Sequence, residues 1–217
     1  MLLASCAKEP SGLQLLAEVR QALANRDARL TGFHFDATST SGAQTLTHSF
    51  DFRSPNQMRV VLPNVERSFD GTSLYEASAG KVTRYALKLS PAKASMFLHE
   101  TFAPYVPEGF RTPLMPMKGV TATKNADTVE LAVAAGSVVY RLRWPGADFL
   151  SKRTGNTTLT VDEEHCEKNF CVPKKLTESI DGVPVVATSL TNIVLAPQRD
   201  AFVPEGVVRE SREVVEE

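Results

Sequence analysis

Apolar and polar residues alternate through much of the chain from Gly32 to Tyr85, and this spacing predicts a series of antiparallel strands with one buried face. Turn-forming pairs separate the strands, among them Ser41-Gly42, Asp70-Gly71 and Ala79-Gly80. The alternating apolar residues fall into three rows: Phe33 and Phe35; Leu46, Phe50 and Phe52; Met58, Val60 and Leu62. We therefore expect a curved sheet whose buried face is rich in phenylalanine.

The segment from Ser90 to Met117 has a different pattern and predicts a helical lid over the sheet. Ser90 can cap a helix whose first residue is Pro91. Later prolines lack the amide donor that a helix interior needs, so they divide the segment into short pieces. The apolar lid residues that we expect to face the sheet are Met96, Phe97, Phe102, Leu114 and Met115.

The rest of the chain extends this architecture. Apolar residues at helical spacing predict an N-terminal helix over 11–26, and strand patterns resume after Gly119 and continue to about Pro197. We expect a tether over 1–10, one domain over 11–209 and a loosely held tail over 210–217. The fold class is α+β, dominated by one antiparallel sheet.

Composition and motifs argue against several classes of function. The net charge is −1 over 217 residues, which is not the electrostatic pattern of a nucleic-acid-binding protein. There is no apolar run of about 18 residues, the length of a membrane-spanning helix. Phosphate-cradling, dinucleotide, nucleophile-elbow and zinc-protease motifs are absent from the sequence. We predict a monomeric binding protein that is not an enzyme and has no cofactor and no metal.

An acidic cluster leaves an enzymatic alternative open. Asp162, Glu163 and Glu164 precede His165 and Cys166, and paired carboxylates can perform acid–base catalysis. Nothing close to them in the sequence would raise the pKa of one carboxyl group, so a solvated strand end is the preferred interpretation. The strand histidines, which we interpret as packing or surface residues, are His34 and His48.

The N-terminal segment Leu3-Ala4-Ser5-Cys6 resembles the lipobox of bacterial lipoprotein signal peptides. The resemblance implies that Cys6 carries lipid and anchors the protein in a membrane. Ala7, in place of Asp, implies the outer membrane by the sorting rule of enteric bacteria.

The other two cysteines, Cys166 and Cys171, bracket a short loop between two predicted strands. Cysteines that face each other across a hairpin can meet disulfide geometry, and export would place them in an oxidising compartment. Free thiols are the second interpretation. A metal site that also uses His165 and the neighbouring acidic residues is the third, because its ligand spacing fits no strong zinc pattern.

Three segments together resemble the LolA/LolB superfamily of lipoprotein carriers, whose relatives include RseB and the LppX/LprG lipoproteins. The first is Phe52-Arg53-Ser54-Pro55-Asn56, like the strand end at which a basic residue precedes proline. The second is the Asp70-Gly71 turn followed by Leu74-Tyr75, and the third runs from Phe202 to Val207. The resemblance extends over most of the chain, from about Ser11 to Val208.

This resemblance implies a strongly curved, incompletely closed antiparallel sheet, a half-barrel, with an N-terminal helix and a short-helix lid over an apolar cavity. The side chains that could line the cavity or simply fill the core are Phe33, Phe35, Phe50, Phe52, Met58, Val60 and the lid residues named above, Met96, Phe97, Phe102, Leu114 and Met115. In the family a basic residue directly precedes the proline. Here Arg53 lies one position earlier, so Arg53 and Arg59 are both candidates for the cavity mouth.

The implied function is that of an envelope lipoprotein that binds acyl chains of lipoproteins or lipids and helps to move or insert them. The expected location is the envelope of a Gram-negative-type bacterium, facing the periplasm and anchored by lipid, in the outer membrane. The alternative is a sensing module of the RseB type, which would read acyl chains or peptides and regulate a protein partner in the envelope.

Overall fold

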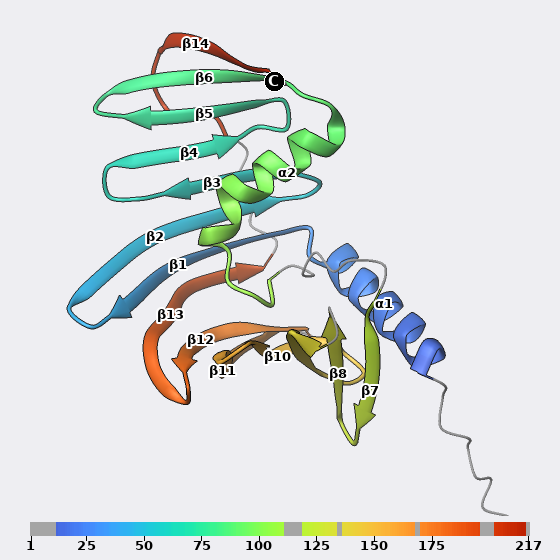
Figure 1. Cartoon of the computed structure of the whole chain (residues 1–217). Coiled ribbons are helices and arrows are strands. Elements are labelled where there is room, and N and C mark those ends of the chain that lie inside the picture. Colours follow the sequence, from blue (N-terminus) through green and yellow to red (C-terminus); the bar gives the residue numbers. More distant parts are fainter. Residues whose placement is uncertain (1–11, 111–118, 134–135, 168–169, 196–201, 216–217) are drawn as a thin grey trace, which may run out of the picture.

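The computed structural model of the protein describes residues 12–110, 119–133, 136–167, 170–195 and 202–215. Figure 1 shows the elements, whose bounds are α1 Gly12–Arg29, β1 Gly32–Ser41, β2 Gln44–Arg53, β3 Gln57–Val61, β4 Val65–Phe69, β5 Ser73–Ser78, β6 Lys81–Lys88, α2 Pro91–Phe102, the 3₁₀ turn η1 Ala103–Tyr105, β7 Thr121–Asn125, β8 Thr128–Val133, β9 Val138–Arg143, β10 Asp148–Thr154, β11 Thr157–Glu167, β12 Phe170–Ile180, β13 Val183–Leu195 and β14 Val208–Val215. The expected N-terminal tether lies outside the described residues, as do the lid residues Leu114 and Met115.

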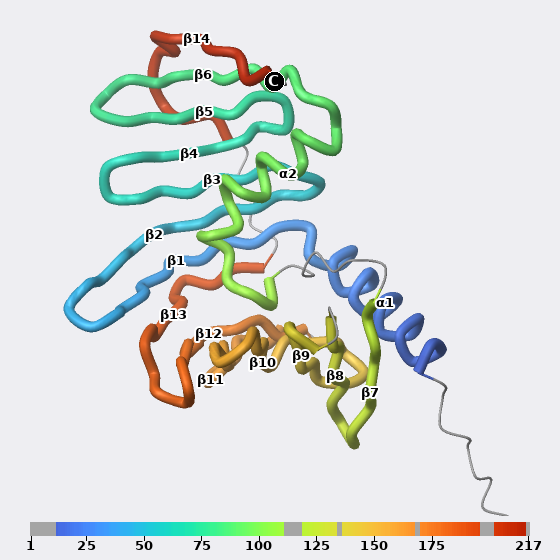
Figure 2. Tube along the Cα trace, in the orientation of Figure 1, coloured from blue at the N-terminus to red at the C-terminus, as the bar shows by residue number. Residues whose placement is uncertain are grey.

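All the described strands belong to one sheet of 14 strands in the order β14-β6-β5-β4-β3-β2-β1-β13-β12-β11-β10-β9-β8-β7. The sheet does not close, because β14 and β7 form its two edges. The trace in Figure 2 follows it as it curls from β14 through β1 and β13 towards β7. This arrangement confirms the predicted fold class, an incompletely closed, mostly antiparallel half-barrel with an N-terminal helix and a short-helix lid.

Hairpin turns of the predicted type help to set the strand register. Asp181 and Gly182 connect β12 to β13 with φ of 51° and 80°, and Ala79 and Gly80 connect β5 to β6 with φ of 48° and 74°. Two consecutive residues at positive φ make the turn whose twist matches that of paired strands. Each turn therefore sets the register of the two strands that it joins, independently of contacts between distant parts of the chain.

The C-terminal segment differs from its prediction as a loose tail. Residues Val208–Val215 form β14, which pairs in parallel with β6, and Arg212 lies opposite Tyr85. The segment is polar because it is an edge strand, and charged side chains at a sheet edge discourage pairing with another chain. A polar sequence was therefore a poor guide to the order of this segment.

The N-terminal helix α1 lies beside β7 (Figure 1) and buries one apolar stripe, as predicted. The stripe consists of Leu15, Leu16, Val19 and Leu23. The helix continues past the predicted end to Arg29, and its last turn includes a buried arginine, Arg26. Among the described residues, no helix is both long and apolar enough to cross a membrane.

The guanidinium group of Arg26 binds three segments that are distant in the sequence. Its Nη2 donates hydrogen bonds to the carbonyl oxygens of Gly109 and Cys171, the latter at 3.2 Å. Its Nε lies 3.7 Å from Oδ1 of Asp148 in an ion pair whose side chains are 2% and 9% exposed. The ring of Phe170 lies against the same group, 4.6 Å from its carbon to the ring centroid. Arg26 therefore joins α1, β10, β12 and the end of the lid segment.

Gly109 allows the lid segment to reach this contact. Its φ is +93°, and a Cβ atom there would lie 2.9 Å from side-chain atoms of Phe149 and Pro173. Only a residue without a side chain fits so close to β10 and β12 in that conformation.

The burial of Arg26 lowers its pKa, and Asp148 opposes this effect by favouring the charged form.

The predicted disulfide is confirmed between Cys166 and Cys171, which lie opposite each other on β11 and β12. The amide of Cys171 donates a hydrogen bond to Oδ1 of Asp148 at 3.4 Å, and its carbonyl accepts from Arg26. The disulfide therefore adjoins the Arg26 contacts and ties the end of the β11–β12 hairpin to the same carboxylate.

We expect Arg26→Met to lower the free energy of unfolding by about 3–5 kcal/mol, because it leaves Asp148 buried without its cation. Urea unfolding checks this value. Arg29→Met is the matched control on the exposed side of α1 and should change stability by less than about 0.5 kcal/mol. Adding Asp148→Asn to Arg26→Met should restore part of the loss. Equal stability of the two arginine variants would contradict this role.

Candidate functional site

The register of β1–β6 places apolar side chains in rows that run across the strands on the concave face. One row follows the pairs Phe33–Phe52, Phe52–Met58, Met58–Phe69, Phe69–Leu74 and Leu74–Tyr85. The second row follows the pairs Phe35–Phe50, Phe50–Val60, Val60–Arg67, Arg67–Glu76 and Glu76–Thr83. The concave face is therefore aromatic and aliphatic over β1–β3, and over β4–β6 the first row stays apolar while the second becomes charged.

The predicted cavity residues of the sheet are brought together on this face. Phe33, Phe35, Phe50 and Val60 have no exposed surface, and Phe52 and Met58 are buried as well. The rings touch one another: the centroids of Phe33 and Phe52 are 5.1 Å apart, and Phe35 and Phe50 are 5.7 Å apart. In this conformation these side chains fill the concave face instead of lining an open space.

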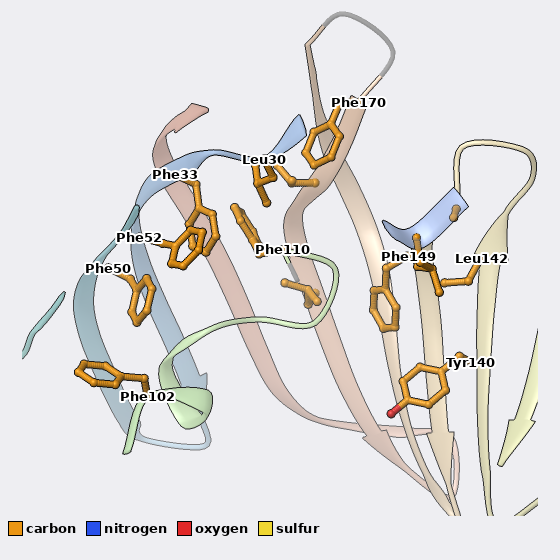
Figure 3. Packing of buried hydrophobic residues seen from close by; sticks show 14 of the residues in the cluster. Leu30, Phe33, Phe50, Phe52, Phe102, Phe110, Tyr140, Leu142, Phe149 and Phe170 are labelled. Atoms are coloured by element: carbon orange, nitrogen blue, oxygen red, sulfur yellow. The ribbon is translucent and has the colours of Figure 1, made fainter. Parts of the chain in front are cut away.

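The lid segment contributes two rings to this cluster, which Figure 3 shows at close range. Phe110 lies 5.0 Å from Phe33 and 4.9 Å from Phe35 between ring centroids. Phe102, at the end of α2, meets Phe50 edge to face at 6.3 Å. Phe110 was not predicted as a site residue, because a residue between prolines gives no periodic signal.

The helix α2 covers the sheet with one side. Its buried residues are Leu98 and Phe102, and Phe97 is half-buried against the core. Met96 points away and is 58% exposed, which corrects the expectation that it faces the cavity. Successive residues point about 100° apart around a helix. With Leu98 and Phe102 turned towards the sheet, Met96 therefore points to solvent.

A pocket of about 410 Å³ opens where α2 and η1 pass over the charged end of the rows. Its aromatic lining comes from Tyr85 on β6, Phe97 on α2 and Tyr105 on η1. Its charged lining consists of Arg67, Glu76 and Glu100, and Leu74 connects it to the apolar row. The volume lies within the range of about 300–1,000 Å³ found for small-molecule sites.

The charged end of the face is internally paired. Nε of Arg67 donates to Oε2 of Glu76 at 2.8 Å, and this hydrogen bond raises the pKa of Arg67. Arg212, opposite Tyr85, bonds in the same way to Glu210 at 3.1 Å. These residues were not predicted, because only the register shows that they lie beside the phenylalanine rows.

The two predicted mouth arginines lie on the other face of the sheet. Arg59 alternates with Met58 and Val60 on β3, and its guanidinium bonds to Glu66 at 2.5 and 2.9 Å and to Asp51 at 3.5 Å. Arg53 follows Phe52 at the end of β2, and the same alternation turns it from the concave face. Neither arginine lies among the cavity residues, which corrects that expectation.

One strand histidine attaches the lid to the sheet. His48 shares the concave face of β2 with Phe50, is 8% exposed and forms a 2.9 Å hydrogen bond from Nε2 to the carbonyl oxygen of Tyr105. Its Nδ1 is buried and has no hydrogen-bond partner within the part of the chain that the structure describes. Burial lowers the pKa of His48, and the bond to Tyr105 and the charge of Asp36 oppose this shift.

The acidic cluster near the disulfide has structural partners. Glu164 accepts two hydrogen bonds from Arg143, at 3.1 and 2.7 Å, and His165 lies 3.1 Å from Glu167. The Glu164, Cys166 and Cys171 ligand atoms lie within 4.8 Å of one another. Both sulfur atoms are used by the disulfide, so they cannot bind a metal as thiolates in this form.

No protein-family model matches this sequence, and no curated protein matches it. Solved structures do match. A LolA superfamily protein from Nitrosomonas europaea aligns over 86% of this chain and 98% of its own, with 10% identity and a TM-score of 0.50. A DUF1329 family protein from Desulfovibrio piger covers 86% and 95%, with 12% identity and a TM-score of 0.49. The Mycobacterium tuberculosis lipoprotein LppX covers 87% and 99%, with 14% identity and a TM-score of 0.37.

The Nitrosomonas likeness confirms, at the level of the fold, the resemblance to the LolA/LolB superfamily that the sequence indicated. At this identity the likeness concerns the path of the chain and not the residues of the concave face, so any function must be argued from those residues.

We expect stability to fall as the pH decreases through the ordinary histidine value of 6.5. The folded state holds His48 with a lowered pKa, so the unfolded state binds the proton more tightly and acid favours unfolding. Urea unfolding between about pH 7.5 and 5 measures the slope. In His48→Gln, an amide can still donate to Tyr105 but does not titrate, so the slope should decrease. His99→Gln is the control, because His99 is exposed on α2. An unchanged slope in His48→Gln would show that His48 is not the source of the pH dependence.

Proposed function

We propose that this protein binds acyl chains on its concave face, beneath α2, and helps to move or insert lipoproteins or lipids in a bacterial envelope without being an enzyme. The observation that carries the proposal is the pair of cross-strand rows that begin with Phe33 and Phe35. They make a continuous apolar surface that a short lid covers. The fold shared with a LolA superfamily protein supports this proposal.

An acyl chain has to replace contacts that the lid makes with the rows. The covering side chains that are fully buried in the cluster are those of Leu98, Phe102 and Phe110, and Phe97, Tyr105 and Val106 pack against it while partly exposed. A helix attached through so few buried side chains belongs to the least stable part of a fold and can move without unfolding the sheet. We infer that α2 and η1 swing away from β2–β6 and that acyl carbon then contacts the uncovered rings.

The energetics permit both uptake and release. Burying an acyl chain of about 16 carbons contributes on the order of 10 kcal/mol at about 0.8 kcal/mol per CH₂. Displacing α2 exposes Leu98 and Phe102, and each buried side chain of this size is worth about 1.5–3 kcal/mol. Fixing the conformation of the bound acyl chain costs further free energy. The remaining free energy is small enough for the ligand to pass to an acceptor.

The envelope location is part of the proposal. The Cys166–Cys171 disulfide supports an oxidising compartment, because such bonds form mainly in exported proteins. The lipobox-like Leu3-Ala4-Ser5-Cys6 supports a lipid anchor, and Ala7 after the cysteine supports the outer membrane. A lipidated Cys6 would hold the sheet near the bilayer from which acyl chains come.

We expect Cys6→Ser to release the natively expressed protein from membranes into the soluble periplasmic fraction, since acyl chains on Cys6 would provide the anchor. Fractionation and mass spectrometry of the N-terminal peptide check this. The control is Cys166→Ser with Cys171→Ser, which should leave the protein membrane-bound. Recovery of the unmutated protein as soluble, unlipidated chain would rule out the anchor.

We expect Phe97→Asp to reduce uptake of a fluorescent fatty-acyl probe by at least about tenfold, because it places a charge where the chain enters beneath α2. Met96→Asp is the matched control: it is the adjacent residue on the same helix, it is 58% exposed, and it should bind the probe normally. Thermal melts on both variants separate lost binding from lost folding. If both variants bind the probe as the parent does, the concave face beneath α2 is not the acyl site.

A further inference from the structure

The pocket at the charged end of the concave face combines aromatic rings with carboxylates. Tyr85, Phe97 and Tyr105 come from a strand, a helix and a 3₁₀ turn, and the fold brings them to one pocket of about 410 Å³. Aromatic faces carry partial negative charge and attract cations within about 6 Å. Several rings around one space form the type of site that binds ammonium groups.

The charges of the lining favour the same ligand. Arg67 is bonded to Glu76 at 2.8 Å, so its charge is already compensated. Glu100, exposed on α2, has no ion-pair partner within the part of the chain that the structure describes. The lining therefore has one carboxylate more than it has guanidinium groups. An anion at Arg67 would meet the carboxylates of Glu76 and Glu100, whereas a cation gains Glu100 and the rings without breaking a bond.

The position of the pocket indicates what carries the ammonium group. Leu74 lines the pocket and also belongs to the apolar row that runs back through Phe69 to Phe33. A molecule with its head in the pocket can lay its tail along this row under α2. Its polar end would remain near solvent, because Pro104 and Glu100 at the pocket are exposed.

We propose that the pocket formed by Tyr85, Phe97, Tyr105 and Glu100 binds an organic ammonium group, and that the ligand of this protein is an amphiphile with an ammonium-bearing headgroup. The identity of the ligand as an amphiphile rests on the proposed acyl-binding function. The ammonium site depends on the pocket alone. The tail then supplies most of the affinity, and the pocket selects among lipids by the charge of their headgroups.

The test compares dodecyltrimethylammonium, dodecanol and dodecanoate as competitors of the fluorescent acyl probe, all below micelle-forming concentrations. The three share one tail, so differences report the headgroup. We expect the ammonium compound to bind about three- to tenfold more tightly than the alcohol, and dodecanoate to bind weakest. Tetramethylammonium, titrated by NMR, distinguishes a free cation from a headgroup: weak binding supports recognition of a headgroup, and tight binding supports a free-cation site.

Variants identify the groups responsible. Phe97→Leu keeps an apolar side chain but removes a ring, and Glu100→Gln removes the unpaired charge, so each should reduce the preference for ammonium over alcohol by about two- to fivefold. Glu18→Gln, an exposed carboxylate on α1, and Met96→Leu are the controls and should keep the preference of the parent protein.

Three outcomes would overturn the inference in different ways. If dodecanol, dodecanoate and the ammonium compound bind equally, the protein holds acyl chains but the pocket does not select a headgroup. If dodecanoate binds tightest and Arg67→Gln abolishes its advantage, the pocket takes an anion. If none of the three competes and the probe itself does not bind, the proposed function fails, whereas binding of tetramethylammonium alone would still support the pocket.

Discussion

The arrangement of the whole fold depends on one buried cation. The guanidinium of Arg26 is out of contact with water, and its binding partners are a carboxylate on β10 and carbonyl oxygens from β12 and the lid segment. Leaving such a group unpaired would cost several kcal/mol, so folding must bring all these segments to it. This constraint positions α1 against one half of the sheet and holds the lid segment at Gly109. The α2 and η1 part of the lid is left to weaker contacts.

The lid is consequently held in two different ways. At Gly109 it is anchored by a buried hydrogen bond next to the disulfide, where Asp148 also accepts a bond from Cys171. Over β2–β6 it rests on a few rings and on the bond from His48 to Tyr105. The lid segment is therefore held firmly at Gly109 and by fewer contacts over β2–β6, and the proposed opening of α2 depends on this contrast.

The concave face is also divided along its length. Strand pairing extends two rows across six strands, and as the rows reach β4–β6 one stays apolar while the other changes from phenylalanine and valine to the paired charges of Arg67 and Glu76. An apolar surface that ends in a pocket with aromatic and acidic groups suits an amphiphile better than a simple hydrocarbon.

The sequence by itself determined the elements that depend on neighbouring residues. Alternation predicted the phenylalanine rows, turn pairs such as Ala79-Gly80 predicted the hairpins, and close spacing predicted the bridge between Cys166 and Cys171. Tertiary structure decided what depends on distant partners. The packing of α2 on the sheet left Met96 in solvent, and parallel pairing with β6 ordered a polar tail. It also brought Arg26 to Gly109 and Tyr85 to Tyr105, because such contacts exist only when the sheet has curled and no local pattern encodes them.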